Sequence, residues 1–145
     1  MSIDENRLSH CVWDCMYHVV WIPKCRRKQI YVSLRHYLGE ILHDLARQRE
    51  CKIVDGHVCV DHVHMLIAIP PKYSVSQVVG FIKGKSAISI ARNFMGKRQN
   101  FTGQSFWARG YYVPTVGRDE ETIKKYIQQQ EKEDQRLEQM SLFKE

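Results

Sequence analysis

The stretch Asp61-His62-Val63-His64-Met65-Leu66-Ile67-Ala68-Ile69-Pro70 decides the fold of this sequence, because it has the pattern of a buried β-strand. It is rich in β-branched and aliphatic residues and stops at a double proline. Side chains alternate between the two faces of a strand, so His62 and His64 share one face. The other face, which we expect to enter the core, carries Val63, Met65, Ile67 and Ile69. Two adjacent imidazoles can bind one cation, although two half-buried histidines bonded to backbone or solvent give the same pattern.

The composition is that of a basic globular domain. The chain has 145 residues, 43% of them hydrophobic and 10% aromatic, which is enough for one domain with one core. Lys and Arg number 22 against 16 acidic residues, which gives a net charge of +6 and a pI near 9.1. This balance favours a polyanionic partner, above all nucleic acid, although a merely basic soluble protein has the same balance.

The sequence carries no signal for a membrane or a secreted protein. No run of about 18 apolar residues is present, and the polar N-terminus lacks the apolar core of a secretory signal. The five cysteines are odd in number and include no CxxC pair, so we expect reduced thiols. We therefore expect a cytoplasmic protein with no membrane partner.

The chain begins with a predicted strand and a basic loop. Cys11–Ile22 is rich in aromatic and β-branched residues and ends at Pro23, so it predicts the first strand. The loop that follows carries Lys24, Arg26, Arg27 and Lys28. Such a cluster would either contact phosphate or form a solvated turn.

A helix and a second strand precede the histidine strand. Ser33 can cap a helix whose apolar stripe recurs at helical spacing over Leu34–Leu45. Cys51–Val60 predicts a strand with a bulge or bend at Asp55-Gly56. The connection to His62 is very short, so we expect an antiparallel hairpin.

The chain after the histidine strand predicts a helix, a strand and a last helix. Ser74 can cap a helix that carries Lys83 and Lys85, either as phosphate contacts or as part of a solvated face. Ser105–Val116 predicts a fourth strand, with Gly110 as a bulge. Beside Arg109, this strand carries three aromatic side chains that would either stack on unpaired bases or pack in the core, Trp107, Tyr111 and Tyr112.

The elements follow the order β-α-β-β-α-β-α, because Asp119 can cap a final amphipathic helix. The first six match an α+β, ferredoxin-like (RRM-like) βαββαβ sandwich with a four-stranded antiparallel sheet. The first and third strands would be central neighbours, and the added C-terminal helix would lie across the open face. We expect one domain over residues 1–145, with flexible ends at about residues 1–10 and 135–145.

The last helix carries a second group of candidate site residues. Tyr126 and Gln130 lie one turn apart and share a face. A metal held by His62, His64 and Gln130 would keep open positions for a phosphate oxygen, and Tyr126 could attack the phosphorus. Considered alone, Tyr126 is more simply an aromatic anchor of an amphipathic helix.

Several stretches in series resemble the single-tyrosine HUH transposases, the TnpA proteins of the insertion sequence 200/605 type. The resemblance spans roughly residues 9 to 134. The matching stretches are Tyr17-His18-Val19-Val20-Trp21, Pro23-Lys24, Arg26-Arg27, Asp61-His62-Val63-His64-Met65-Leu66, Pro70-Pro71-Lys72, Lys83-Gly84-Lys85-Ser86, Phe106-Trp107-Ala108-Arg109-Gly110-Tyr111-Tyr112, Thr115-Val116-Gly117 and Ile127 within the tyrosine helix.

The resemblance implies a specific chemistry. His62, His64 and Gln130 would bind Mg²⁺ or Mn²⁺, and Tyr126 would be the nucleophile that leaves a 5′-phosphotyrosine and a free 3′-OH. The substrate would be single-stranded DNA recognised through imperfect hairpins near the element ends. The chain would act as a homodimer with active sites completed in trans. Charge and position assign DNA binding to Lys24, Arg26, Arg27, Lys28, Lys83, Lys85 and Arg109.

Two other functions use the same scaffold. A domesticated, repeat-associated nickase would share every residue of this chemistry and would differ only in its genomic surroundings. A non-catalytic single-stranded nucleic-acid-binding module would need aromatic platforms, but it would not need the two histidines, the tyrosine and the glutamine together. The presence of all four favours the transposase over the binding module.

Overall fold

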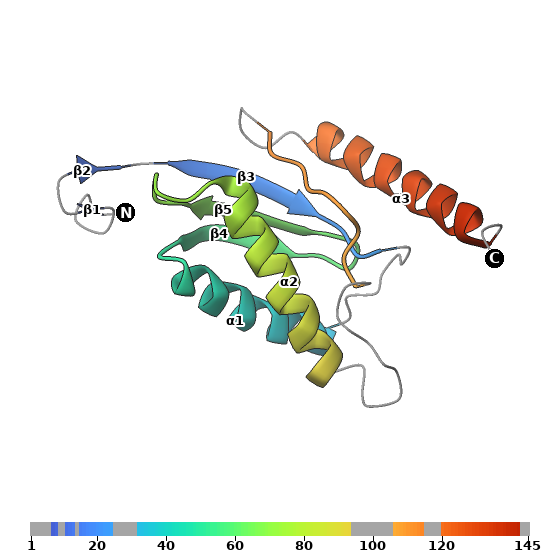
Figure 1. The fold of residues 1–145 in the computed structure, drawn as a ribbon, viewed down its shortest axis with the longest axis horizontal. Coiled ribbons are helices and arrows are strands. Elements are labelled where there is room, and N and C mark those ends of the chain that lie inside the picture. The colour runs from blue at the N-terminus through green and yellow to red at the C-terminus, as the bar shows by residue number, and fades with distance from the viewer. Residues whose placement is uncertain are drawn as a thin grey trace.

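The computed structural model of the chain describes residues 7–8, 11–13, 15–24, 32–93, 106–114 and 120–142 (Figure 1). Its elements are β1 (Arg7–Leu8), β2 (Cys11–Val12), β3 (Met16–Trp21), α1 (Val32–Gln48), β4 (Lys52–Val58), β5 (Val63–Ala68), α2 (Val75–Asn93) and α3 (Glu120–Leu142). The chain is therefore an α+β protein, as predicted. Among the described helices, none combines the length and apolar character needed to cross a membrane.

The main sheet has three antiparallel strands in the order β3-β5-β4, so the histidine strand is central. In the register, His64 of β5 lies between Val20 of β3 and His57 of β4. The predicted hairpin and the predicted adjacency of the first and third strands are both confirmed. A register shift between Ile53 and Asp55 marks the bend that the sequence indicates in β4.

The predicted four-stranded sheet is corrected to three strands and a flanking segment. Residues 106–114, here called the edge segment, run beside β3 and the residues that follow it, with isolated bridges from Tyr112 to Val20 of β3 and from Trp107 to Pro23. Gly110 lies between these bridges with a φ of +81°, a left-handed conformation that interrupts regular pairing. Backbone hydrogen bonds of 2.8 to 2.9 Å still attach the edge segment to the chain around β3. The edge segment therefore occupies the place of the fourth strand without being one.

The first predicted strand differs from the structure, and the ranges predicted as flexible ends include regular elements. The predicted strand Cys11–Ile22 is interrupted, because β2 ends at Val12 and pairs with β1, whereas β3 begins at Met16. β1 itself lies within the range predicted as a flexible end. α3 continues to Leu142, so residues 135–142 are helical. Composition that is uniformly favourable for strand or helix does not show where an element stops.

Of the two serines predicted to cap these helices, one is confirmed by the structure and the other is wrong. Ser74 caps α2, because its Oγ accepts a hydrogen bond of 3.1 Å from the Gln77 backbone N–H. In return, Gln77 Oε1 accepts a bond of 2.9 Å from the Ser74 N–H, which completes a capping box. Ser33 is wrong as a cap, because α1 begins at Val32 and Ser33 is exposed inside its first turn.

The two faces of the sheet carry different layers (Figure 1). α1 and α2 pack on one face, in a core that includes Val19 of β3. The next residue, Val20, points to the other face, where it packs with Ile123 and Ile127 of α3. α3 therefore covers the face that α1 and α2 leave open, which is where the sequence places the added helix.

Candidate active site

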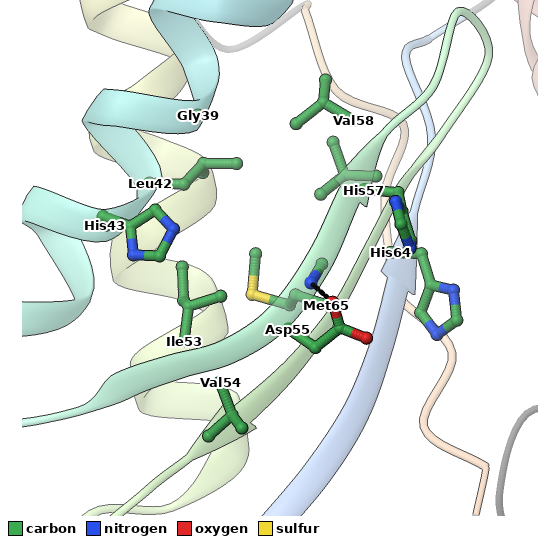
Figure 2. Close-up of a pocket in the computed structure, with 12 residues that line it drawn as sticks. Gly39, Leu42, His43, Ile53, Val54, Asp55, His57, Val58, His64 and Met65 are labelled. Carbon is green, nitrogen blue, oxygen red and sulfur yellow. Dashed lines mark hydrogen bonds between the residues drawn. The ribbon is translucent and has the colours of Figure 1, made fainter.

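The predicted histidine pair lies at the start of β5, on the face beneath α3. Because His64 pairs with Val20 and with His57, all three side chains share that face. Figure 2 shows His57 and His64 on the side of the sheet away from α1, whereas Met65 points toward α1. His64 is only 6% exposed, and His62 is half-buried. The predicted division of this strand into a histidine face and a core face is confirmed.

A cavity of about 330 Å³ lies between these histidines and α3. Imidazole, carboxylate and thiol groups from the β4–β5 hairpin face apolar and basic side chains from the helix. The lining residues are His57, Cys59, Asp61, His62, His64, Ile123, Lys124 and Ile127. The sheet and the helix thus enclose a space with several groups that can bind a metal or a phosphate.

His62 is oriented as metal-binding histidines usually are. Asp61 Oδ1 lies 2.7 Å from His62 Nδ1. A carboxylate that accepts the Nδ1 proton fixes the tautomer and leaves Nε2 for a metal. Among the described residues, no three His, Cys, Asp or Glu side chains converge closely enough to hold an ion by themselves. A divalent ion here would need another ligand type, and the amide oxygen of Gln130 suits Mg²⁺ or Mn²⁺.

His64 is in contact with a third imidazole. His18 Nδ1, from the neighbouring strand β3, lies 3.3 Å from His64 Nε2, and the ring centroids are 5.5 Å apart. This contact is a hydrogen bond when either nitrogen carries the proton. A metal bound through His64 Nε2 would replace it.

α3 brings Tyr126 and Gln130 to the edge segment rather than to the cavity. The half-buried Tyr126 ring stacks on Tyr112, with centroids 5.5 Å apart and planes inclined by 21°. Gln130 Nε2 lies 3.9 Å from the position that a Cβ would take on Gly110. The cavity instead receives Lys124, which lies about 200° around the helix from Tyr126. Within one chain, the nucleophile candidate and the histidine pair therefore lie on opposite flanks of α3.

The predicted DNA-binding residues are dispersed over the molecule. Lys24 is exposed just after β3, and Arg109 is exposed on the edge segment. Lys85 is exposed on α2, where it lines a surface depression between α1 and α2. The remaining residues of the predicted basic loop, Arg26, Arg27 and Lys28, lie outside the described residues.

Lys83 has a different environment from the other predicted DNA contacts. Its Nζ donates hydrogen bonds of 2.8 Å to the carbonyl of Ala108 and 2.7 Å to the carbonyl of Gly110. Burial lowers the pKa of Lys83 to about 8. In this structure its ammonium is bonded to the edge segment and is not presented to a phosphate.

The sequence alone assigns no role to several residues around the site. Asp61 is adjacent to the histidine pair, and His57 follows once the hairpin register is known. Lys124 could be found by projecting the last helix, since it flanks the apolar stripe that faces the sheet. His18 depends on the pairing of two strands that lie far apart in the chain, and no local pattern reveals it.

Comparison with known proteins places the chain among transposases. The family described as "Transposase IS200 like" matches residues 11–130. The transposase of insertion sequence element IS200 from Salmonella typhimurium is 42% identical over 139 residues, which are 96% of this chain and 91% of the relative. The ISDra2 transposase TnpA from Deinococcus radiodurans is 28% identical over 120 residues, 82% of this chain and 86% of the relative.

Solved structures share the fold. The crystal structure of a candidate transposase from Deinococcus radiodurans R1 has a TM-score of 0.75 at 29% identity, and the match covers 86% of this chain and 96% of that one. A REP-associated tyrosine transposase bound to a REP hairpin has a TM-score of 0.53 at 13% identity, over 83% of this chain and 68% of that one. The second likeness concerns the fold alone.

Proposed function

The chain belongs to the family of IS200-like transposases, and from this premise we propose that it cuts and rejoins single-stranded DNA with Tyr126 as nucleophile. A divalent ion would be held by His62, His64 and Gln130. The observation that carries the proposal is the cavity beneath α3, in which the histidine pair of the central strand faces the helix that bears Tyr126.

The cleavage step is an attack by the Tyr126 hydroxyl oxygen on a phosphodiester phosphorus. A bond forms between that oxygen and phosphorus, and the bond to the 3′ oxygen breaks, which leaves a 5′-phosphotyrosine and a free 3′-OH. Because a tyrosine hydroxyl has an ordinary pKa of about 10, its proton must pass to a base or water during the attack. Attack of a 3′-OH on the phosphotyrosine then rejoins the DNA and releases Tyr126 without ATP.

The residues around the cavity have defined tasks in this scheme. Asp61 holds the ring of His62 so that its other nitrogen faces outward as a ligand. Gln130 does not line this cavity, and it would add a neutral oxygen ligand when α3 is delivered from a second chain, as argued below. When bound, Mg²⁺ or Mn²⁺ would orient the scissile phosphate and offset its charge. Lys124 lines the same cavity and would add positive charge near the phosphate.

We propose single-stranded DNA with imperfect hairpins as the substrate. The net charge of +6 and the exposed Lys24, Lys85 and Arg109 support a polyanionic ligand. The REP-associated transposase of the same fold is bound to a REP hairpin, and the proposal extends this kind of ligand to the present chain. We leave Lys83 out of the DNA-binding set, because its ammonium is bonded to the edge segment.

We further propose a homodimer whose active sites are completed in trans. Tyr126 and Gln130 lie on the edge segment, on the flank of α3 away from the histidine cavity. In this arrangement neither Tyr126 nor Gln130 lines the histidine cavity of its own chain. Delivery of α3 from a second chain would supply the missing groups.

An oligonucleotide cleavage assay tests the chemistry. We would mix the full chain with labelled single-stranded DNA from the flanking ends of its own gene, in Mg²⁺, Mn²⁺ or EDTA. Tyr126→Phe and His64→Ala test the named roles. Tyr73→Phe and His36→Ala are matched controls, since Tyr73 precedes α2 and His36 is exposed on α1.

The expected result is a metal-dependent covalent protein–DNA adduct that Tyr126→Phe and His64→Ala abolish and the two controls retain. DNA binding without an adduct in any metal, unchanged by EDTA or by Tyr126→Phe, would contradict the catalytic proposal. The non-catalytic binding module would then be the better description.

A further inference from the structure

The ammonium of Lys83 links α2 to the edge segment. Two of its three N–H donors are used by the carbonyls of Ala108 and Gly110, at 2.8 and 2.7 Å. One turn along α2, the buried Ser86 Oγ accepts a hydrogen bond of 3.0 Å from Trp107 Nε1. α2 thus attaches to three residues of the edge segment through two side chains on one helix face.

The edge segment needs this attachment because its own pairing is sparse. Between the bridges at Trp107 and Tyr112, Gly110 takes a left-handed conformation that turns the backbone out of register. Carbonyls that do not pair with a neighbouring strand require another partner when they are partly buried. Lys83 supplies that partner for the part-buried carbonyl of Ala108, and it also bonds the exposed carbonyl of Gly110.

The same segment is the surface on which the tyrosine helix rests. Tyr112 stacks on Tyr126, and Gly110 lies beside the side chain of Gln130. Ala108 packs in the cluster that contains Ile123 and Ile127. The proposed nucleophile Tyr126 and the proposed metal ligand Gln130 therefore lie against Tyr112 and Gly110 of the edge segment. Lys83 bonds the Gly110 carbonyl directly, and Tyr112 lies two residues further along.

We infer that Lys83 is a positioning residue, which holds the edge segment as the docking platform for the tyrosine helix and does not bind DNA. This inference rests on the proposed function for its effect on cleavage. A shift of about 1 Å in a reacting group can cost a hundredfold in rate, so loosening the platform would slow chemistry while leaving substrate binding intact.

The test compares Lys83→Met with Lys85→Met in the full chain. Lys85 is close by on the same helix, but its side chain is exposed. Three quantities are measured: the dissociation constant for hairpin DNA, the adduct rate at saturating DNA and Mn²⁺, and amide hydrogen exchange. The exchange measurement needs neither DNA nor metal.

For Lys83→Met we expect DNA affinity within about twofold of the unmodified chain, a saturated adduct rate lower by about tenfold to a hundredfold, and faster exchange in the edge segment and α3 but not in α1. For Lys85→Met, which removes an exposed residue of the proposed DNA-binding set, we expect weaker DNA binding and unchanged hydrogen exchange. Ser86→Ala removes the bond from Trp107 and the 3.1 Å bond that Ser86 Oγ donates to the Lys83 carbonyl within α2, and it should reproduce the Lys83→Met pattern more weakly. It takes the place of Lys83→Met if that variant does not fold.

The inference is overturned if Lys83→Met weakens DNA binding as Lys85→Met does and leaves the saturated rate unchanged, because Lys83 would then be a DNA contact. Unchanged hydrogen exchange in the edge segment would overturn it as well. If even the unmodified chain forms no adduct, the proposed function fails, but the exchange data still decide whether Lys83 holds the platform.

Discussion

At the scale of single residues, Asp61 is placed to orient His62, which we propose as a metal ligand. Its carboxylate lies 2.7 Å from His62 Nδ1, and both groups line the cavity beneath α3. A carboxylate in this position settles which ring nitrogen carries the proton and makes the other a better ligand. The ligand strength of His62 should therefore depend on a residue that does not bind the ion itself.

Asp61→Asn should weaken Mn²⁺ binding by about tenfold to a hundredfold, because the amide is a poorer acceptor for the Nδ1 proton. Electron paramagnetic resonance of free Mn²⁺ measures the affinity directly. Asp44→Asn is the matched control, since Asp44 is exposed on α1 and pairs with Arg47. Equal Mn²⁺ affinity in the two variants would show that Asp61 does not orient a metal ligand.

The lowered pKa of Lys83 predicts how the free energy of unfolding depends on pH. Burial lowers its pKa in the folded chain to about 8, from the ordinary lysine value of 10.5. Between these two pH values the unfolded chain holds a proton that the folded chain has released, so the free energy of unfolding rises with pH. Below about pH 8 both states are protonated, and the cost of burying the charge is present in full.

We therefore expect the unmodified chain to gain stability relative to Lys83→Met as the pH rises from 8 toward 10.5. Urea denaturation of both proteins at several pH values measures the difference between their free energies of unfolding. The free energy of unfolding of Lys85→Met should change with pH in the same way as that of the unmodified chain. If the free-energy difference between the unmodified chain and Lys83→Met stays constant or shrinks as the pH rises, the carbonyl acceptors of Lys83 offset the effect of burial on its pKa.

At the scale of elements, the hairpin that carries the site depends on a close backbone approach. A Cβ on Gly56 of β4 would lie 3.1 Å from the carbonyl oxygen of His64 and 3.4 Å from Met65 Cα. Gly39 of α1 has no atom within 4 Å of its Cβ position. An added Cβ would therefore be crowded at Gly56 but would meet open space at Gly39.

Gly56→Ala should lower the free energy of unfolding by about 1–3 kcal/mol, because β4 must move away from β5. Gly39→Ala should raise it by roughly 0.5–1 kcal/mol, because alanine costs less conformational entropy in a helix. Urea denaturation measures both. A stabilising Gly56→Ala would show that the hairpin is looser than the structure describes.

Elements with a strong local pattern were predictable from sequence, and elements that depend on distant partners were not. The alternation around His64 predicted which face of β5 enters the core, and Ser74 with Gln77 marks the start of α2 through contacts within four residues. The edge segment has the composition of a strand, but its conformation at Gly110 is tied to Lys83, which lies in another element. Local propensity contains no information about that bond.

At the scale of the whole molecule, the sheet separates two kinds of surface. The histidine cavity and α3 occupy one face, whereas α1, α2 and the exposed Lys85 occupy the other. The types of the candidate site residues could be predicted from sequence, but their grouping could not. The helix places Tyr126 on one flank and Lys124 on the other, and only the docking of α3 on the sheet shows which flank meets the histidines.

The placement of Tyr126 leads to a prediction about two chains. If the histidine pair of one chain works with the tyrosine of another, a mixed dimer of His64→Ala and Tyr126→Phe contains one intact site. That site combines the histidines of the Tyr126→Phe chain with the tyrosine of the His64→Ala chain. If each chain uses its own tyrosine, every site in the mixed dimer lacks an essential group.

We expect co-expressed His64→Ala and Tyr126→Phe chains to form the metal-dependent DNA adduct, although each variant alone forms none. The adduct should be on the His64→Ala chain, because that chain carries the intact tyrosine, and a size tag on one chain identifies it. Because at most one of two sites is restored, activity should stay below about half that of the unmodified dimer. No adduct from mixed dimers whose presence is verified would place nucleophile and histidines on the same chain, and α3 would then have to rotate or shift to turn Tyr126 toward the cavity.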